Sequence, residues 1–468
     1  MRAAVVLASL VSLAVPAAAG AATWSAPQDL SSPHLFVDRP QLDVGGDGSA
    51  LARWAYGDDG RGGVSSASRA PGAGAFGPAR ALVRAHDVER RSDRIEGLAA
   101  YGRSSALLAF TRPAGRPNVT RRIRLGVRFG RTDGTFGERR TIRAAGGSTR
   151  TASRIAGVDL AVSASGDAAL AWFEDRGTRI DRVYVSLRPA GGRFGAPRRL
   201  ATGRIRGVAA AVGAAGDVLV AWDARGVLRT RFKPRTRRGF RATDTIRSEE
   251  AFNAEMEPVV TPTGRAVLAW SAQFTSEGGG SRAVRFQTAE RPAGASRFAR
   301  ADLLDRIPAG TYDGLGRPIE AVVDSNGRVA VAWSGGETTR RIPHTPPERG
   351  LYVTRDDAPG QQLSRSGGDV AILSDLAAGS GGRLIAVWDD GLEARNSVVS
   401  AAVAPAAGEP FGPPEDASPA GQDARFGHAA FDPVTGRATI VWSNRPQGSG
   451  GPVAEIETFA QAAPARSD

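Results

Sequence analysis

The sequence predicts an all-β fold: a single closed β-propeller of eight four-stranded blades, in which an N-terminal strand closes the last blade. Three observations predict it. A short phrase ending in tryptophan recurs at a regular spacing, each unit divides into four strand-like segments, and the final unit has only three. A fixed repeat of this size is typical of propellers, solenoids and arrays.

The recurring phrase is clearest in GRVAVAW, residues 327–333. An additional copy, SSALLAF at 104–110, ends in Phe110 where the others end in tryptophan. The copies lie about fifty-five residues apart on average. A large apolar side chain at one place in every unit is suited to packing between neighbouring blades. We therefore predict a structural role for the anchor tryptophans, Trp54, Trp172, Trp222, Trp270, Trp333, Trp388 and Trp442.

One unit, residues 155–200, shows the pattern of four short strands. The segments IAGVDLAVSA, AALAWF, RVYVSLR and GAPRRL are strand-like, and SGD, EDRGTRID and PAGGRF connect them. The unit has no helical periodicity. Small residues dominate the first segment, which suits an innermost strand because blades crowd together near the ring axis.

The two ends of the chain indicate how the ring closes. The last unit, 428–461, contains only three strand-like segments. The stretch WSAPQDL at 24–30 matches the fourth-strand segment FGAPRRL at 194–200, with Trp24 in the place of phenylalanine. An open ring would leave two free sheet edges. We therefore predict that residues 24–30 pair with the strand near 453–461.

The first residues have the features of a secretory signal peptide, expected to occupy residues 1–22. A basic start precedes an apolar run over 3–15 and a series of small residues. The mature chain is expected to begin between Gly20 and Thr23, and to form one extracellular, monomeric propeller domain over 23–468 without a membrane span. Cysteine is absent, which excludes disulfides and thiolate sites.

The formal net charge of +13 comes almost entirely from arginine, because Lys233 is the only lysine. A basic chain can bind anionic partners such as nucleic acid or acidic glycans. Here the arginines are spread along the chain, and no basic run contains interleaved aromatic residues. The sequence therefore predicts no nucleic-acid partner.

Several stretches share the pattern G-x-A-V-A-V-W followed by R-P-A-G-G-x-[FW]-x-x-P-x-x-L, namely 166–200, 264–304, 327–333 and 382–417. This repeat resembles a family of secreted β-propeller proteins common in high-G+C actinobacteria, most of them uncharacterised and some labelled sialidase-like. The resemblance covers nearly the whole mature chain and implies a propeller fold and export. It transfers no mechanism.

No motif predicts a catalytic, cofactor-binding or metal-binding residue. GAGAFG at 72–77 lacks the following helix that a dinucleotide site needs. The DDG stretches at 58–60 and 389–391 lack the alternating ligands of a calcium loop, so we expect solvated turns there, with calcium binding left open. Sialidase Asp boxes place tryptophan three residues after glycine, whereas here the anchor follows glycine by six.

One set of arginines suggests an anion-binding site. In six units an arginine leads into the innermost strand, and innermost strands begin beside the ring axis. Converging guanidinium groups would suit a carboxylate, sulfate or phosphate. The alternative is that these arginines extend into solvent or pair with Glu96, Glu257 and Glu320. The set comprises Arg39, Arg94, Arg154, Arg206, Arg317 and Arg425.

Two functions remain open from the sequence. The first is a non-catalytic extracellular binding or scaffold module for an anionic glycan, a cell-wall polymer or a protein. The alternative is a sialidase-like carbohydrate-active hydrolase, which the missing Asp boxes disfavour. The long connections between second and third strands, and between blades, share one face. We expect the ligand site there, because variable loops on a rigid scaffold commonly bind ligands.

Overall fold

The computed structural model describes residues 24–31, 36–58, 61–83, 94–114, 120–148, 154–175, 180–246, 252–275, 282–307, 318–335, 350–356, 358–364, 371–391, 397–420, 422–445 and 457–462. Their regular structure consists of β-strands and one short 3-10 helix, η1 (Ser380–Gly382). The all-β class is therefore confirmed. No helix in these residues is long and apolar enough to cross a bilayer.

Among the described residues, seven antiparallel sheets each contain four strands consecutive in the chain. We number them blades 1 to 7. The first four comprise β2 (Phe36–Val44), β3 (Ala50–Asp58), β4 (Arg61–Arg69) and β5 (Arg80–Val83); β6 (Arg94–Tyr101), β7 (Ser105–Ala114), β8 (Thr120–Arg131) and β9 (Arg140–Ser148); β10 (Arg154–Val162), β11 (Ala168–Asp175), β12 (Asp181–Arg188) and β13 (Arg198–Gly203); β14 (Ile205–Val212), β15 (Val218–Ala224), β16 (Val227–Lys233) and β17 (Asp244–Ile246).

Blades 5 to 7 follow the same order, from the innermost strand to the outermost. They comprise β18 (Phe252–Val260), β19 (Ala266–Thr275), β20 (Arg282–Arg291) and β21 (Asp302–Ile307); β22 (Ile319–Val323), β23 (Val329–Gly335), β24 (Gly350–Arg355) and β25 (Ala358–Gln362); β26 (Ile372–Ala378), β27 (Leu384–Asp390), β28 (Val398–Ala404) and β29 (Glu415–Asp416).

One more four-stranded sheet joins the two ends of the chain, and we call it blade 8. It contains β30 (Asp423–Phe431), β31 (Ala438–Arg445) and β32 (Glu457–Ala462), and its outermost strand is the N-terminal β1 (Gln28–Asp29). The pairing of β1 with β32 is antiparallel and places Gln28 opposite Ala460. The first described strand therefore lies beside the last.

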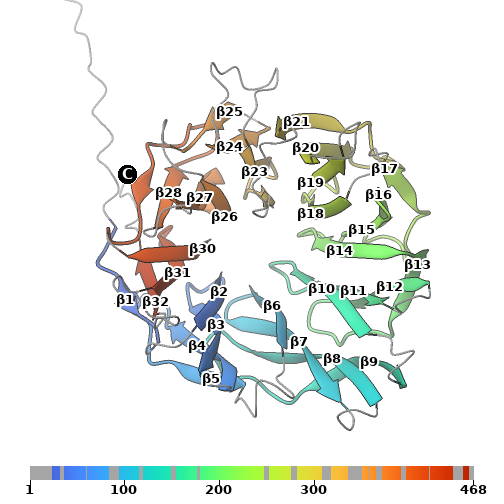
Figure 1. Ribbon diagram of the computed structural model, residues 1–468, viewed down its shortest axis with the longest axis horizontal. Coiled ribbons are helices and arrows are strands. Elements are labelled where there is room, and N and C mark those ends of the chain that lie inside the picture. The colour runs from blue at the N-terminus through green and yellow to red at the C-terminus, as the bar shows by residue number, and fades with distance from the viewer. Residues whose placement is uncertain are drawn as a thin grey trace, which may run out of the picture.

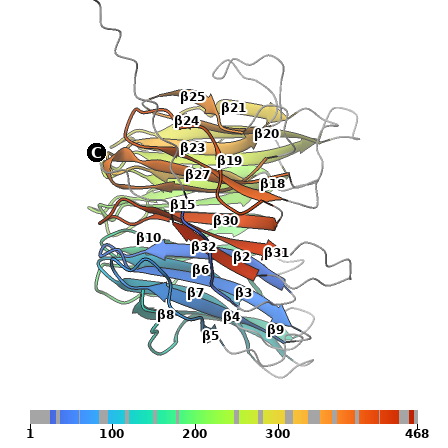
Figure 2. The same cartoon turned by 90° about the vertical axis from the view of Figure 1, so that its left-hand side faces the viewer.

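The blades are arranged in a ring, which Figure 1 shows face-on and Figure 2 from its side. Each innermost strand packs beside the next, in the order β2, β6, β10, β14, β18, β22, β26 and β30, and β30 packs beside β2 again. This arrangement of radially repeated four-stranded sheets is a β-propeller, as the sequence predicted.

The anchor tryptophans occupy the spaces between blades. All seven are at most 1% exposed, and Phe110 is 4% exposed. Trp333 of blade 6, for example, lies in one apolar cluster with Val259 and Phe286 of blade 5. The predicted structural role of these side chains is confirmed.

Glutamine side chains connect outermost strands to the following blade in two places. Gln361 of β25 exchanges two hydrogen bonds with the backbone of Phe411: Gln361 Nε2 donates to its carbonyl over 2.9 Å, and its amide donates to Gln361 Oε1 over 3.0 Å. Gln28 of β1 exchanges the same two bonds with Phe76 of blade 1, over 2.7 and 2.8 Å. The N-terminal strand thus contacts its neighbour as a regular fourth strand does.

The fourth strands begin later in the chain than the sequence predicted. The segment GAPRRL was expected to be a strand throughout, but β13 begins only at Arg198. Before it, Gly195 donates a backbone hydrogen bond to Leu187, and Pro197 has no amide hydrogen to donate to a ladder. The predicted strand 24–30 also begins late, and only Gln28–Asp29 forms β1.

Candidate binding site on the ring axis

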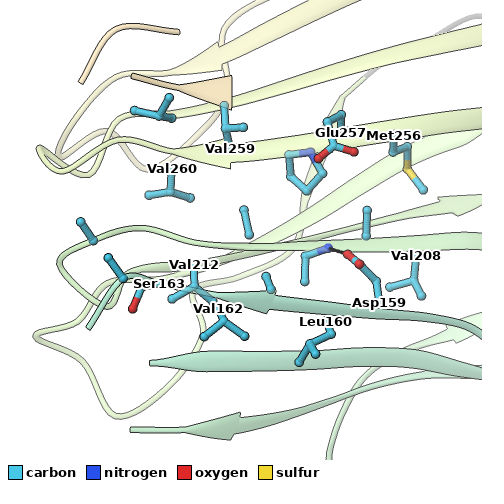
Figure 3. Close-up of a pocket in the computed structure, with 18 of the residues that line it drawn as sticks. Asp159, Leu160, Val162, Ser163, Val208, Val212, Met256, Glu257, Val259 and Val260 are labelled. Atoms are coloured by element: carbon cyan, nitrogen blue, oxygen red, sulfur yellow. Dashed lines mark hydrogen bonds between the residues drawn. The ribbon is translucent and has the colours of Figure 1, made fainter. Parts of the chain in front are cut away.

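A cavity of about 750 Å³ lies along the innermost strands of blades 3, 4 and 5 and reaches the end of β22. Most of its described lining is valine, alanine and leucine. Three carboxyl groups also line it, those of Asp159, Glu257 and Asp324, and none of the described lining residues is basic. Figure 3 shows Asp159 and Glu257 toward one end of the cavity and Ser163 toward the other.

The cavity extends toward the face that carries the short turns. Residues of the first-to-second turns contribute to its lining: Ser163, Ala164, Ala214, Pro262 and Ser325. The sequence had placed the ligand site at the opposite, long-loop face. Loop lengths in the sequence do not predict this cavity, because its walls consist mainly of strand residues that come together only when the blades pack.

The strand register brings one residue of every blade to the same level of the axis. Each is paired with the residue immediately before the anchor tryptophan or phenylalanine, and we call this set the axial ring. Four of its members carry a carboxyl group. The ring comprises Gln41, Gly97, Asp159, Ala209, Glu257, Glu320, Asp375 and His428.

β-Bulges direct several ring residues. In five blades the register shifts immediately before the ring residue, which applies to Gln41, Gly97, Asp159, Asp375 and His428. A bulge re-aims the side chain that follows it and often occurs beside functional sites. The bulges therefore help to set the side chains of the ring at one level.

Two ring aspartates link neighbouring blades through the backbone. Asp159 Oδ2 accepts a hydrogen bond from the Ala210 amide of blade 4 over 2.6 Å. Asp375 Oδ2 accepts one from the Ala429 amide of blade 8 over 2.7 Å. Each bond joins an innermost strand to the innermost strand of the next blade. The two aspartates therefore have a structural role in blade packing.

Burial raises the pKa values of three ring carboxyls, those of Asp159, Glu257 and Glu320. Burial raises the pKa of Asp159 to about 6, although the amides of Ala210 and Leu160 oppose the shift. Burial, and then the carboxylates of Asp375, Glu255 and Asp159, raise the pKa of Glu320 to about 8.

Glu257 is subject to the same effects as Glu320. Burial is the main cause that raises its pKa well above the usual range, and the Glu320 carboxylate is the next. Like charges in a poorly solvated space cannot all ionise together. The ring therefore retains protons at neutral pH.

Blade 1 contributes a basic group to this region. Arg53, which is 6% exposed, pairs in the sheet with Gln41 and donates a hydrogen bond to its Oε1. Asp43 lies two residues beyond Gln41, and burial raises its pKa to about 7 despite the Ala100 amide and the charge of Arg53. Arg53 partly offsets the negative charge of the axis.

His428 belongs to the acidic side of the ring. Its Nδ1 atom lies 3.3 Å from Asp375 Oδ2, and the Leu42 amide donates to the same Nδ1 over 3.4 Å. The imidazole therefore lies between Asp375 of blade 7 and the Leu42 backbone of blade 1.

The predicted arginine set does not share one register position. Arg154 is 71% exposed and pairs with Asp175, over 2.6 Å between Nε and Oδ2. Arg425 pairs with Asp423 over 2.8 Å between Nε and Oδ1.

The other members of the set are less fully described. Arg206 is exposed. Arg39 lies within β2 and Arg94 begins β6, but the side chains of both lie outside the described part of the structure. Arg317 lies outside the described residues.

The sequence analysis did not identify the axial ring, although the spacing of its members along the chain is nearly constant. Its members lie thirteen residues before the anchor in every blade except the last, where the interval is fourteen. The arginines singled out lie fifteen to eighteen residues before it. Only the register, bulges included, shows which of these neighbouring positions faces the axis.

Asp389 was expected in a solvated turn, and this expectation was wrong. Its side chain is 2% exposed. It accepts a hydrogen bond from the Phe426 amide over 3.0 Å and one from Ser374 Oγ over 2.8 Å. Phe426 has a positive φ of 60°, and the carboxylate stabilises this uncommon conformation. No group of three or more metal-ligating side chains was found among the described residues.

No family model matches the chain, and no curated protein matches its sequence. Solved structures with a similar fold include a protein of unknown function from Dyadobacter fermentans DSM 18053, with 11% identity, 93% of this chain and 98% of that chain covered, and a TM-score of 0.39. The Dos1 propeller has 10% identity, coverage of 92% and 95%, and a TM-score of 0.45. A mutant NanB sialidase from Streptococcus pneumoniae has 10% identity, coverage of 93% and 70%, and a TM-score of 0.37.

Proposed function

We propose that this protein is an extracellular, non-catalytic binding module that holds a small ligand in its axial cavity. The observation that carries the proposal is the pairing of a cavity of about 750 Å³ with carboxyl groups from two blades, Asp159 and Glu257. An ionised carboxylate attracts an ammonium group, and a protonated carboxyl donates a hydrogen bond to a hydroxyl. The ligand class we propose is therefore cationic or rich in hydroxyl groups.

The scaffold suits binding because the cavity walls are rigid elements. Its lining strands β10, β14 and β18 are each held in a four-stranded sheet. The bond from the Ala210 amide to Asp159 also fixes one of the carboxyl groups before any ligand arrives. A site on preformed strands loses little conformational entropy on binding.

Binding of wild type to a matched panel tests this proposal. The panel contains 1,4-diaminobutane, the neutral 1,4-butanediol, glucose, sialic acid and sulfate, measured by calorimetry at low ionic strength. We expect the diamine or the sugar to bind, and Asp159→Asn and Glu257→Gln to weaken that binding at least ten-fold. Glu409→Gln, an exposed carboxyl outside the ring, is the control. Equal binding by all variants would contradict the proposed site.

Carbohydrate hydrolysis is a second candidate, favoured by one observation. Asp159 and Glu257 are two carboxyl groups in one cavity. Asp159 accepts backbone hydrogen bonds, and burial together with the Glu320 carboxylate raises the pKa of Glu257 well above its usual range. Glycoside hydrolases use such pairs as nucleophile or base and as acid. A panel of fluorogenic glycosides, sialosides included, tests this. Turnover that is lost in Glu257→Gln would establish hydrolysis in place of simple binding.

Export and ring closure complete the proposal. We infer that residues 1–22 direct secretion. N-terminal sequencing of the protein recovered from medium should find a start between Gly20 and Thr23. We also infer that the pairing of β1 with β32 holds the ring closed, as the contact of Gln28 with Phe76 supports.

A further inference from the structure

The carboxyl groups of the axis extend beyond the cavity that two of them line. Asp159 and Glu257 belong to the cavity, whereas Glu320 and Asp375 occupy the same register position in blades 6 and 7. These neighbouring blades pack together through β18, β22 and β26. The carboxyls of the cavity and those beyond it are therefore parts of one continuous set.

We propose that this set makes ligand binding proton-linked: a cation bound beside Asp159 and Glu257 displaces protons that the ring carboxyls share. The inference rests on the proposed function and adds its regulation. Affinity for a cation then rises with pH, and the cavity releases a cationic ligand in acidic surroundings.

The physical reason is that the bound charge replaces a proton. A cation close to a carboxyl favours the ionised form and lowers its pKa. Protons then leave the ring as the cation enters, so affinity must increase with pH wherever the free ring is protonated. The pKa values of about 6 for Asp159 and about 8 for Glu320 place this range around neutral pH.

The groups that face the ring from every neighbouring strand are mostly acidic. Glu255 and Glu257 come from β18, Glu320 from β22, Asp375 from β26 and Asp159 from β10. Strands β6 and β14 contribute Gly97 and Ala209, which are uncharged. Arg53 and Asp43 face the ring from blade 1, and His428 from β30. Among the groups that the structure describes, the single guanidinium of Arg53 cannot neutralise this many carboxyls, so protons supply the remaining positive charge.

Calorimetry of the full chain tests the linkage. The probe is 1,4-diaminobutane, whose amines stay protonated throughout, titrated between pH 5.5 and 8.5 in phosphate and in MOPS. The difference in heat between the buffers counts the protons released. We expect release of about one proton per bound diamine, and an affinity that rises about ten-fold per pH unit in the middle of the range. The neutral 1,4-butanediol should show no such rise.

Glu320→Gln distinguishes the shared ring from a local effect, because Glu320 does not line the cavity. We expect this variant to bind the diamine, to release fewer protons and to show a flatter dependence on pH. Glu409→Gln should behave as wild type. Binding without proton release, or unchanged release in Glu320→Gln, overturns the linkage and leaves the binding proposal intact. Absence of diamine binding at every pH overturns both.

Discussion

At the scale of single residues, the anchor tryptophans are alike in burial but differ in hydrogen bonding. Trp333 Nε1 donates to Asp305 Oδ2 over 3.0 Å, and Asp305 is 3% exposed. Trp222 is fully buried, and its Nε1 has no hydrogen-bond partner among the residues that the structure describes. The anchor position therefore gains a hydrogen bond from its indole nitrogen in one blade and lacks it in another.

This difference predicts unequal effects of one substitution. Trp222→Phe and Trp333→Phe remove similar apolar area, but Trp333→Phe also removes the donor to a buried carboxylate. We expect Trp333→Phe to lower the free energy of unfolding by about 1–3 kcal/mol more than Trp222→Phe. Urea unfolding of both variants checks this. Equal losses would show that the Asp305 bond contributes nothing.

Glu320 provides a second prediction at this scale, concerning pH. Its folded pKa of about 8 exceeds the unfolded value of about 4.3. Because the pKa of Glu320 is higher in the folded state, folding is most favourable when this group is protonated. Its full contribution to the free energy of unfolding is present below the unfolded pKa, and it is lost as the pH rises through the folded pKa. The protonated form stabilises the fold, so wild type should lose stability between about pH 4 and pH 8.

Glu320→Gln should remove most of this loss, because the amide stays neutral. We expect the variant to exceed wild type by about 1–3 kcal/mol at pH 8 and to match it near pH 4, after allowing for partial solvent contact. Urea unfolding across pH measures the difference, with the exposed Glu409→Gln as control. A constant difference at all pH values would refute this assignment of the pH dependence to Glu320.

At the scale of elements, the N-terminal strand is very short, yet its removal has the largest expected effect on stability. β1 spans two residues, yet Gln28 repeats the contact that Gln361 makes elsewhere in the ring. Deleting residues 23–31 exposes one edge of β32. We expect a loss of several kcal/mol in stability or a failure to fold, because a free edge also permits wrong pairing. An unchanged melting temperature of the deletion variant would contradict the closure hypothesis.

Point variants separate the strand from its side-chain contact. Gln28→Ala and Gln361→Ala each remove a reciprocal pair of hydrogen bonds, and each should cost about 1–2 kcal/mol. Thermal unfolding compares the two. If only Gln361→Ala destabilises the protein, β1 does not act as a regular fourth strand.

The arginine of the R-P-A-G motif ends the third strand of its blade and makes a further repeated contact. Arg291 ends β20 and is 2% exposed, and its guanidinium lies 3.5 Å from the centre of the Phe232 ring in the previous blade. Arg188 ends β12 in the same way and lies 5.0 Å from the ring centre of Tyr101 in blade 2. The arginine of the R-P-A-G motif thus connects blades by cation–π contact.

At the scale of the whole molecule, charge is distributed unevenly. The chain has a net charge of +13, yet the axial ring contains four carboxyl groups. A cationic ligand would meet repulsion from the whole molecule and attraction at the axis. Anions would meet the reverse. The two kinds of ligand should therefore bind at different places, with opposite dependence on salt.

The arginine prediction can be tested on this basis. Sialic acid, uronate polymers and sulfate are measured against wild type and the double variant Arg39→Ala/Arg317→Ala at several ionic strengths. If the arginines form an anion site, wild type should bind these anions better than a neutral sugar at low salt, and the double variant should lose that preference. Equal binding by both proteins would show that the arginines reflect composition.

By itself the sequence determined the class and layout of this protein. The anchors at Trp54 to Trp442, the four segments per unit and the match of 24–30 to a fourth strand all depend on local periodicity, which is visible along one chain. Burial of the anchors followed directly, because large apolar side chains at a fixed place in each unit need a common interior.

Only the tertiary structure decided which residues face the axis. Asp159, Glu257 and Glu320 are separated by dozens of residues, and the register of each innermost strand, set in several blades by a bulge, aligns them at one level. A shift of one residue turns a side chain to the opposite face of a sheet. Composition and spacing drew attention to arginines near the axis, whereas packing shows that carboxyl groups lie there as well. Burial raises the pKa values of Asp159, Glu257 and Glu320, and neighbouring carboxylates add to the shifts of the two glutamates.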